Sequence, residues 1–328
     1  MDHATPYATL TPDVVLDAIE EAGFAVDGSL LALNSYENRV YQVGLNEGRF
    51  LVAKFYRPGR WDMATIQEEH DFSLELAAEE IPVVAPLASA SGETLHHHAG
   101  FAYALFPRQG GRPPELDDPE HLRQLGRFLG RIHAVGAIRA FTHRPALTLQ
   151  RFGHEALAFL FSSGMIPAEL EHNYRLAAES LLQQVEDRLT AVGPVRQLRL
   201  HGDCHPGNIL WTDRGPHFVD LDDCMTGPAI QDLWMLLSGE RQDMQRQLGL
   251  LLEGYKTFFD FDPLELLLIE ALRALRLLHY SAWLAARWHD PAFPRAFPWF
   301  NTPRYWEDQL NTLREQAERL IEPALELP

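Results

Sequence analysis

The chain has 328 residues, and its 28 basic and 46 acidic side chains give a formal net charge of −18 at pH 7. This surplus of carboxylates argues against a nucleic-acid-binding protein, because proteins that track phosphates present stripes of Lys and Arg. No run approaches the ~18 uninterrupted apolar residues of a membrane span, and the acidic N-terminal segment lacks the basic-then-apolar order of a signal peptide. We therefore expect a cytoplasmic protein with no nucleic-acid partner and no membrane partner, long enough for about two domains or lobes.

Two residue types are rare in this chain. Cys204 and Cys224 are the only cysteines, which is too few for a disulfide framework, and a reducing compartment would keep both as thiols. Lys54 and Lys256 are the only lysines, since Arg supplies the other basic side chains.

The first third of the chain is predicted to be rich in β-structure. Thr11 followed by Pro12 is typical of a helix N-terminus, and alternating apolar residues on both sides of a turn predict a β-hairpin. The expected elements are a helix at 12–23, hairpin strands at 39–43 and 49–55, a helix at 62–80, and strands at 94–97 and 100–106.

Strand patterns nearly vanish after residue 107, and wide Leu-rich helical faces take over. The expected helices span 119–135, 167–192, 230–239, 240–259, 263–287 and 303–321, with one short β interruption at 199–201 and 217–220. This order predicts an α+β fold of two lobes: a small β-rich N-lobe over residues 1–107 and a larger, mainly helical C-lobe over residues 108–328.

The densest group of polar residues is His-Gly-Asp-Cys-His-Pro-Gly-Asn, which holds Asp203 and Asn208, and Asp220 follows Asp203 by seventeen positions. Carboxylates beside core-forming strands are costly unless a cation satisfies them, and Mg²⁺ prefers hard oxygen ligands. We interpret Asp203 as the group that orients or deprotonates an attacking hydroxyl, with Asn208 and Asp220 binding Mg²⁺ beside a transferring phosphoryl group. Each residue alone could be a turn former, but the three together favour catalysis.

Lys54 is expected on an inward face of the second hairpin strand, because alternation places it with Phe50 and Val52. A buried Lys needs an anionic partner, and the following helix offers Glu68 and Glu69. A Lys held by a Glu can bind the α and β phosphates of a nucleotide, and we prefer Glu69 as the partner. The alternative is an edge-strand Lys that prevents aggregation.

The segment 34–38 lies between two strand patterns and includes Ser35. It could fold over phosphates and donate backbone N–H groups and the Ser35 hydroxyl. A plain Asx or Ser turn explains the same residues equally well.

These residues together resemble the aminoglycoside phosphotransferase and choline kinase branch of the protein-kinase-like fold. The matching motifs are Val52-Ala53-Lys54, the helical Glu, His201 to Asn208, Asp220-Leu221-Asp222 and Gly227-Pro228. Within that branch, residues 34–41, 55–58, 231–235 and 290–294 resemble bacterial stress-response kinases. The resemblance spans nearly the whole chain.

The resemblance implies ATP-dependent phosphorylation of protein Ser or Thr hydroxyls by a cytoplasmic monomer in envelope or oxidative stress survival. It also implies a role for each matched residue: Asp203 as proton acceptor, Asn208 and Asp220 as magnesium ligands, Ser35 as a nucleotide contact, Lys54 as the phosphate-binding lysine, Glu69 as its partner, and Asp222 as a secondary acidic residue near the metal.

The chain departs from ordinary protein kinases at several motifs. His-Gly-Asp replaces His-Arg-Asp, Asp-Leu-Asp replaces Asp-Phe-Gly, and both the Gly-rich loop and the Ala-Pro-Glu element are missing. Without an Arg after His201, the usual phosphate-sensing switch has no anchor. Regulation by activation-loop phosphorylation is therefore not expected, although autophosphorylation elsewhere stays possible.

Two other functions fit part of the pattern. The same chemistry could act on a small amino alcohol, sugar or aminoglycoside-like acceptor, and a binding-only pseudokinase could use nucleotide to close its lobes. A zinc site at residues 201–205 fits poorly because adjacent ligands do not converge on one ion, and the run 96–98 of three His is better explained as a solvated turn. The aromatic residues over 283–306 are expected in the core, with a substrate-recognising wall as the alternative.

Overall fold

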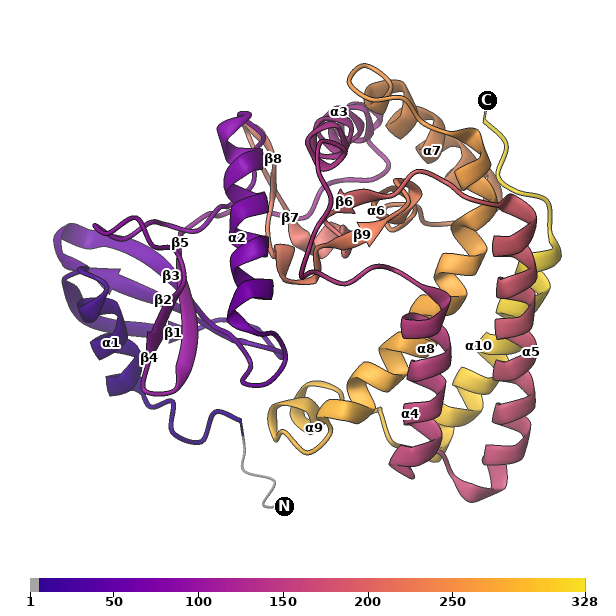
Figure 1. Ribbon diagram of the computed structural model, residues 1–328, viewed down its shortest axis with the longest axis horizontal. Helices are drawn as coiled ribbons and strands as arrows, with labels where there is room; N and C mark the ends of the chain where they lie inside the picture. Colours follow the sequence, from indigo (N-terminus) through magenta and orange to yellow (C-terminus); the bar gives the residue numbers. More distant parts are fainter. Residues whose placement is uncertain (1–5, 328) are drawn as a thin grey trace.

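The computed structural model describes residues 6–327 and has two lobes (Figure 1). The N-lobe holds a five-stranded antiparallel sheet in the order β1-β2-β3-β5-β4. Its strands are β1 (Val26–Ala32), β2 (Arg39–Leu45), β3 (Arg49–Phe55), β4 (His96–His98) and β5 (Phe101–Pro107). This agrees with the α+β fold expected from the sequence.

Helix α1 (Pro12–Glu21) covers one end of this sheet, where its apolar side enters the N-lobe core. The Thr11 hydroxyl caps the helix by accepting a hydrogen bond from the Val14 N–H at 3.3 Å. Val15 and Ile19 are fully buried against strand residues. Strand β1 was not among the expected elements, because its residues are mostly exposed and do not alternate between buried and exposed.

Helix α2 (Met63–Ala78) lies between the sheet and the C-lobe (Figure 1). The Asp62 carboxylate accepts a hydrogen bond from the Thr65 N–H at 2.8 Å and starts the helix. Phe72 and Leu76 on α2 are fully buried in the same core cluster as C-lobe leucines. One face of α2 thus belongs to the C-lobe core, so the helix connects the two lobes.

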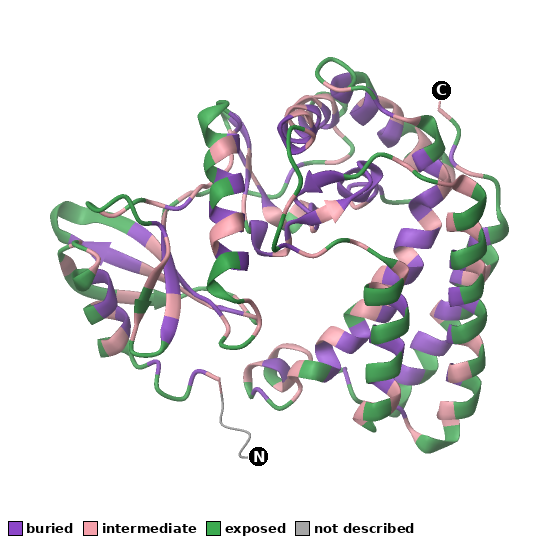
Figure 2. Ribbon diagram, viewed as in Figure 1, coloured by how far each residue is buried: buried purple, intermediate pink, exposed green. Residues whose placement is uncertain are grey.

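The C-lobe is mainly helical and has two buried cores (Figure 2). Its helices are α3 (Pro119–Gly136), α4 (Ala156–Ser163), α5 (Ala168–Val192), α6 (Ile230–Trp234), α7 (Arg241–Tyr255), α8 (Ile269–Arg287), α9 (Ala292–Ala296) and α10 (Pro303–Ile321). Two antiparallel pairs interrupt them: β6 (Leu198–Leu200) with β9 (Met225–Gly227), and β7 (Ile209–Thr212) with β8 (Gly215–Phe218). No helix in residues 6–327 is long and apolar enough to cross a membrane.

Several expected element boundaries were wrong. The helix expected at 230–239 ends at Trp234, and Gly239 then takes a left-handed backbone (φ 85°) before α7 begins. Residues Pro263–Leu268 form a 3-10 helix that leads into α8. Helix α4 and the π-helical turn before it, Gln150–Glu155, were not predicted, and neither were β7 and β9, whose three or four residues are too short for a periodic pattern.

Candidate active site

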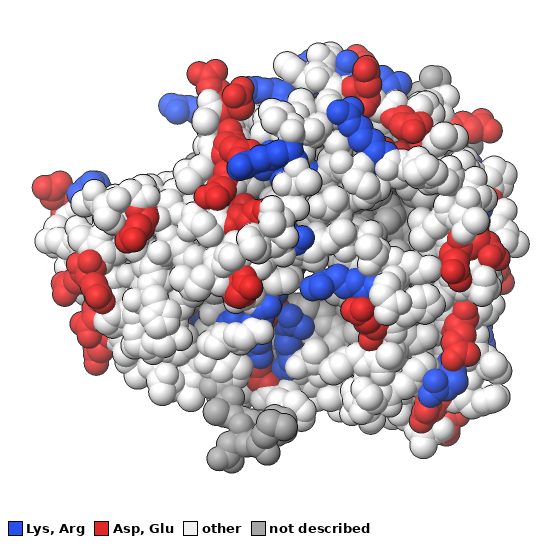
Figure 3. Space-filling view, viewed as in Figure 1, with Lys and Arg blue, Asp and Glu red and all other residues white. Residues whose placement is uncertain are grey.

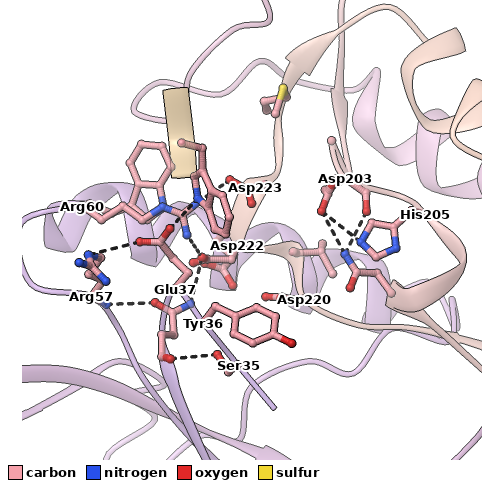
Figure 4. Close-up of a pocket in the computed structure, with 18 of the residues that line it drawn as sticks. Ser35, Tyr36, Glu37, Arg57, Arg60, Asp203, His205, Asp220, Asp222 and Asp223 are labelled. Atoms are coloured by element: carbon pink, nitrogen blue, oxygen red, sulfur yellow. Dashed lines mark hydrogen bonds and ion pairs between the residues drawn. The ribbon is translucent and has the colours of Figure 1, made fainter. Parts of the chain in front are cut away.

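A cavity of about 1210 Å³ lies between the lobes, and its lining includes every site residue predicted from the sequence. From the N-lobe come Ser35, Lys54 and Glu69, and from the C-lobe come Asp203, Asn208, Asp220 and Asp222. In Figure 4, Asp220 lies between Asp222 on one side and Asp203 with His205 on the other. The cavity therefore brings together groups separated by more than half of the chain.

The β7–β8 hairpin explains why Asn208 and Asp220 meet. Asn208 directly precedes β7 and Asp220 follows β8 by one residue, so antiparallel pairing brings the two ends side by side. The Asn208 carbonyl accepts a hydrogen bond from the Val219 N–H at 3.0 Å. The Asn208 side-chain amide donates to the Asp203 carbonyl at 3.0 Å, which leaves the side-chain oxygen as its group for a cation.

Asp232 on α6 holds the loop that carries Asp203. Its fully buried carboxylate accepts hydrogen bonds from the N–H groups of His201 at 2.9 Å and Gly202 at 2.8 Å, and it also pairs with His133 Nε2 at 3.1 Å. Gly202 has φ 85°, and a Cβ there would lie 2.3 Å from the Asp223 carbonyl oxygen. Only Gly fits this position, which explains why the loop reads His-Gly-Asp instead of His-Arg-Asp. Residues 231–235 stood out in the sequence only by resemblance, and no motif pointed to this role of Asp232.

Asp203 is held as a carboxylate by two C-lobe groups. Arg276 Nη1 on α8 donates to Asp203 Oδ1 at 2.7 Å, and His205 Nε2 lies 3.4 Å from Oδ2. Burial alone would raise the pKa of Asp203, but the hydrogen bond from His205 and the charge of Arg276 outweigh it and hold the pKa well below its ordinary value. No motif pointed to Arg276, because it lies 73 residues away in an otherwise ordinary helix.

Lys54 reaches into the cavity from β3 and faces three carboxylates. Its Nζ lies 3.0 Å from Asp220 Oδ1, 3.4 Å from Asp222 Oδ1 and 3.6 Å from Glu69 Oε1. Burial would lower the pKa of Lys54, but the three carboxylates raise it well above its ordinary value, so the side chain is charged. Burial raises the pKa of Glu69 to about 7, although Lys54 opposes this effect.

Glu68, the other candidate partner of Lys54, points away from the cavity. Its carboxylate accepts hydrogen bonds from the backbone N–H groups of residues 142–144 in the C-lobe, at 2.5 to 2.7 Å. Of the two adjacent glutamates of α2, Glu69 therefore pairs with Lys54 of the N-lobe, whereas Glu68 binds backbone of the C-lobe.

Asp220 and Asp222 have different environments. The Asp220 side chain is 54% exposed to the cavity, on a left-handed backbone (φ 59°). Asp222 is buried, with Asn38 Nδ2 donating to it at 3.0 Å and Arg60 paired with it. Burial would raise the pKa of Asp222, but Arg60 and Lys54 hold it well below its ordinary value. Asp220 is thus the more accessible of the two carboxylates for a metal.

Ser35 lies in a loop that is closed on itself and attached to the C-lobe. Its hydroxyl donates to the Asn38 carbonyl at 2.9 Å, as in the simple Ser turn considered above, and the loop lines the cavity. Glu37 accepts a hydrogen bond from Trp283 Nε1 at 2.7 Å and pairs with Arg287 on α8. These contacts between the lobes were not foreseen.

The neighbouring Asp290 makes a similar connection. Its fully buried side chain pairs with Arg39 at 3.2 Å and with Arg57 at 2.8 Å, and both arginines belong to the N-lobe. Residues 290–294 were noted in the sequence only for their resemblance. The structure shows that this segment ties the N-lobe strands β2 and β3 to the C-lobe.

The donor set suits a hard cation better than zinc. Within residues 6–327, no three His, Cys, Asp or Glu side chains are grouped so that they could hold a metal ion. Asn208 and Asp220 instead offer oxygen atoms from adjoining ends of the β7–β8 hairpin, and Mg²⁺ takes few protein ligands because phosphates and water complete its shell. Cys204 and Cys224 are both buried, and burial raises the pKa of each thiol, which disfavours a reactive thiolate.

The aromatic residues near the C-terminus divide between core and cavity. Phe293, Phe300 and Trp306 are buried in the second C-lobe core, as expected. Trp283 and Phe297 instead line the cavity. Some of these aromatic residues therefore belong to the core, as expected, and others form part of the cavity wall, which was the alternative.

Comparison with known proteins defines the class. A model of the "Phosphotransferase enzyme family" matches residues 29–269, and the chain belongs to that family. The chain is therefore a kinase, as its two-lobe fold and its cavity of carboxylates around a buried lysine already indicated.

Individual relatives give a more specific comparison than the family does. The chain is 47% identical over 326 residues to "Stress response kinase A" of Salmonella choleraesuis, and equally to "Serine/threonine protein kinase RdoA" of Salmonella typhimurium; each match covers 99% of this chain and 98% of the relative. Among solved structures, the amicoumacin kinase hAmiN has a TM-score of 0.72 at 19% identity, covering 96% of both chains. A microcompartment-associated aminopropanol kinase has a TM-score of 0.68 at 18% identity, covering 94% of this chain and 97% of the other. The resemblance stated from the motifs is confirmed, and the solved structures support the fold.

Proposed function

We propose that this protein is an ATP- and Mg²⁺-dependent kinase that transfers the γ-phosphoryl group to Ser or Thr hydroxyls of a cytoplasmic protein during stress. The observation that carries the proposal is the meeting of Asp203, Asn208 and Asp220 with Lys54 in one cavity between the lobes. We infer the Ser or Thr acceptor from relatives that are 47% identical to this chain, one of which is named a serine/threonine protein kinase.

In this proposal, Asp203 orients the hydroxyl group of the acceptor. Its carboxylate stays ionised beside Arg276 and can accept the hydroxyl proton as the oxygen attacks the γ-phosphorus. The new bond forms between the hydroxyl oxygen and phosphorus, the bond between the γ-phosphorus and the β–γ bridging oxygen breaks, and ADP leaves. Arg276 binds Oδ1 of Asp203 at 2.7 Å, whereas Oδ2 has only the longer contacts with His205 and Asn208, each at 3.4 Å, so Oδ2 is the oxygen better able to turn to the acceptor.

Lys54 and its partners position the nucleotide in the same scheme. Lys54 is held by Glu69 and Asp220 with its charge pointing into the cavity, where it can bind phosphate oxygens. Asn208 and Asp220 would hold Mg²⁺, which neutralises charge on the phosphates when bound. Asp222 would join them through Oδ1, which lies 3.4 Å from Lys54 Nζ, since Oδ2 is paired with Arg60.

A small-molecule acceptor is the second candidate. It is favoured by the structural neighbours, which include a kinase named for aminopropanol and one named for amicoumacin. Both candidates use the same chemistry at Asp203. A phosphate-transfer assay with radiolabelled ATP, comparing protein extracts with a panel of amino alcohols and sugars, separates them: label in protein bands that is absent in Asp203→Ala supports the protein kinase, whereas label only in small alcohols contradicts it.

A further inference from the structure

Asp222 is held by side chains of the other lobe through only one of its two carboxylate oxygens. The residue lies in the 3-10 turn Leu221–Asp223 of the C-lobe and is 3% exposed. Its Oδ2 accepts a hydrogen bond from Asn38 Nδ2 at 3.0 Å and pairs with Arg60. Within residues 6–327, Oδ1 has no hydrogen-bond partner although it is buried. A buried carboxylate oxygen without a hydrogen bond is costly unless a cation satisfies it.

Oδ1 of Asp222 points toward the part of the cavity that holds the other metal-binding candidates. Lys54 Nζ lies 3.4 Å from this oxygen and 3.0 Å from Asp220 Oδ1, so both oxygens face the same ammonium group. Figure 4 shows Asp220 beside Asp222 in the cavity. The buried oxygen therefore lies where it can share a cation with Asp220.

Arg60 comes from the loop between β3 and α2, and it bridges two carboxylates of the C-lobe. Its Nη1 pairs with Asp222 Oδ2, and its Nη2 pairs with Asp223 Oδ1. The arginine side chain is 10% exposed, and its guanidinium lies 5.1 Å from the centroid of the Trp61 ring. Two carboxylates and one guanidinium leave this group with a net negative charge. Arg60 can thus fix the orientation of Asp222 without cancelling its attraction for a cation.

Asn38 connects the same carboxylate to the backbone of the N-lobe. Its side-chain oxygen accepts a hydrogen bond from the Arg57 N–H at 3.0 Å, so its amide nitrogen faces Asp222. Asn38 is itself buried, and its carbonyl accepts a hydrogen bond from the Ser35 hydroxyl. Because both polar atoms of its side chain are engaged, Asn38 is held in one orientation.

We propose that Asn38 and Arg60 are positioning residues for the divalent metal. By binding Oδ2 of Asp222, they turn Oδ1 toward the ion that Asn208 and Asp220 would also hold. The proposal deepens the proposed function and rests on it. Groups that orient a metal ligand in this way typically change metal affinity by about 10–100-fold.

This arrangement makes the metal site depend on the approach of the two lobes. Asn38 and Arg60 belong to the N-lobe, whereas Asp222 belongs to the C-lobe. Figure 3 shows Lys and Arg side chains gathered in the hollow between the lobes, with Asp and Glu side chains close to them. Asp222 is therefore oriented for the metal only when the lobes are together.

The test measures how far Mg²⁺ tightens nucleotide binding, which requires no phosphoryl transfer. The affinity of a fluorescent nonhydrolysable ATP analogue is measured with Mg²⁺ and with EDTA. Asn38→Ala and Arg60→Lys both leave the net charge unchanged, but Ala donates no side-chain hydrogen bond and Lys lacks the planar fork that bridges two carboxylates. We expect Mg²⁺ to raise the affinity at least about tenfold in the wild type and at most about twofold in either variant, with the affinity in EDTA unchanged.

Asn311→Ala and Arg304→Lys are the matched controls, because both residues are exposed on α10 and neither lines the cavity. An effect of Mg²⁺ in Asn38→Ala or Arg60→Lys as large as in the controls would overturn the proposal. So would the absence of an effect in the wild type, or an equal loss of affinity in EDTA, which would indicate a merely structural role.

The same experiment separates this proposal from the proposed function. If Mg²⁺ tightens binding only when Asn38 and Arg60 are intact, but no Ser or Thr is phosphorylated, the protein-kinase function fails and the positioning role stands. If proteins are phosphorylated and both variants respond to Mg²⁺ as the wild type does, the positioning role fails and the kinase function stands.

Discussion

Glu68 of the N-lobe helix and Arg144 of the C-lobe are joined by a hydrogen bond of 2.7 Å from the Arg144 backbone N–H to the Glu68 carboxylate. The Arg144 side chain continues the connection, because its Nε donates to the Cys224 carbonyl at 2.8 Å and its guanidinium also bonds the Asp222 carbonyl. Helix α2 is thereby linked to the loop that carries Asp220.

Glu68→Gln should weaken this connection. An ionised carboxylate accepts three backbone hydrogen bonds here, and losing bonds to a charged group costs about 1.5–3 kcal/mol. We expect a lower free energy of unfolding by that amount in urea denaturation, together with a raised KM for MgATP. Glu79→Gln is the control, since Glu79 is exposed at the end of the same helix. Equal stability of the two variants would show that Glu68 does not connect the lobes.

Asp203→Ala should remove the proton acceptor. We expect kcat to fall about a thousandfold, the middle of the roughly 10²–10⁴-fold that general bases contribute, while the affinity for nucleotide changes little. Steady-state phosphoryl transfer and titration with an ATP analogue measure the two effects. ATP turnover equal to that of the wild type would instead favour a pseudokinase that only binds nucleotide.

The two lysines of the chain allow a controlled test of the phosphate-binding role. Lys54→Ala leaves three carboxylates without their shared cation, and breaking a buried ion pair costs about 3–5 kcal/mol. We expect loss of stability and of productive phosphate positioning, seen as a large drop in kcat/KM. Lys256→Ala should have no effect, because Lys256 is exposed beyond the end of α7. Unchanged kinetics in Lys54→Ala would mean that another group binds the phosphates.

We expect Asn208 and Asp220 to be the residues through which phosphoryl transfer depends on a divalent metal. Chelation of divalent ions should abolish transfer, and Asp220→Asn should raise the Mg²⁺ concentration needed for half-maximal activity by at least about tenfold, because it removes the accessible anionic ligand. Asp213→Asn is a suitable control, since Asp213 is exposed in the β7–β8 turn and outside the cavity. An unchanged Mg²⁺ requirement in Asp220→Asn would remove this residue from the metal site.

Acid should destabilise the N-lobe through His70. This buried side chain lies between the hydroxyls of Tyr56 at 2.8 Å and Thr94 at 2.9 Å, and burial lowers its pKa from 6.5 to about 3. Below about pH 6.5 the unfolded chain binds a proton that the folded protein does not, so stability falls as the pH falls toward about 3.

His70→Gln should make this loss less steep, by up to about 1.4 kcal/mol per pH unit. Urea denaturation from pH 7 to pH 4.5 measures the slope, with His154→Gln as the exposed control. If the slope is the same in His70→Gln and the wild type, His70 titrates normally in the folded protein.

The motifs alone predicted most of the site because their chemistry is local. Asp203 and Asn208 are five residues apart in one loop, and alternation along β3 was enough to point Lys54 inward. The choice between Glu68 and Glu69 was harder, since adjacent helical residues differ only in the direction they face. Strand β1 and helix α4 were missed because exposed or short elements carry little periodic signal.

Residue types and their periodicity thus determined the two-lobe plan and the carboxylate, amide and lysine groups of the site, because these depend on neighbours within a few turns of chain. Only the tertiary structure decided what surrounds those groups. Arg276 reaches Asp203 across 73 residues, and Arg39 reaches Asp290 across 251. An arginine in a helix looks the same in sequence whether it faces solvent or an active-site carboxylate, since folding sets which distant surfaces meet.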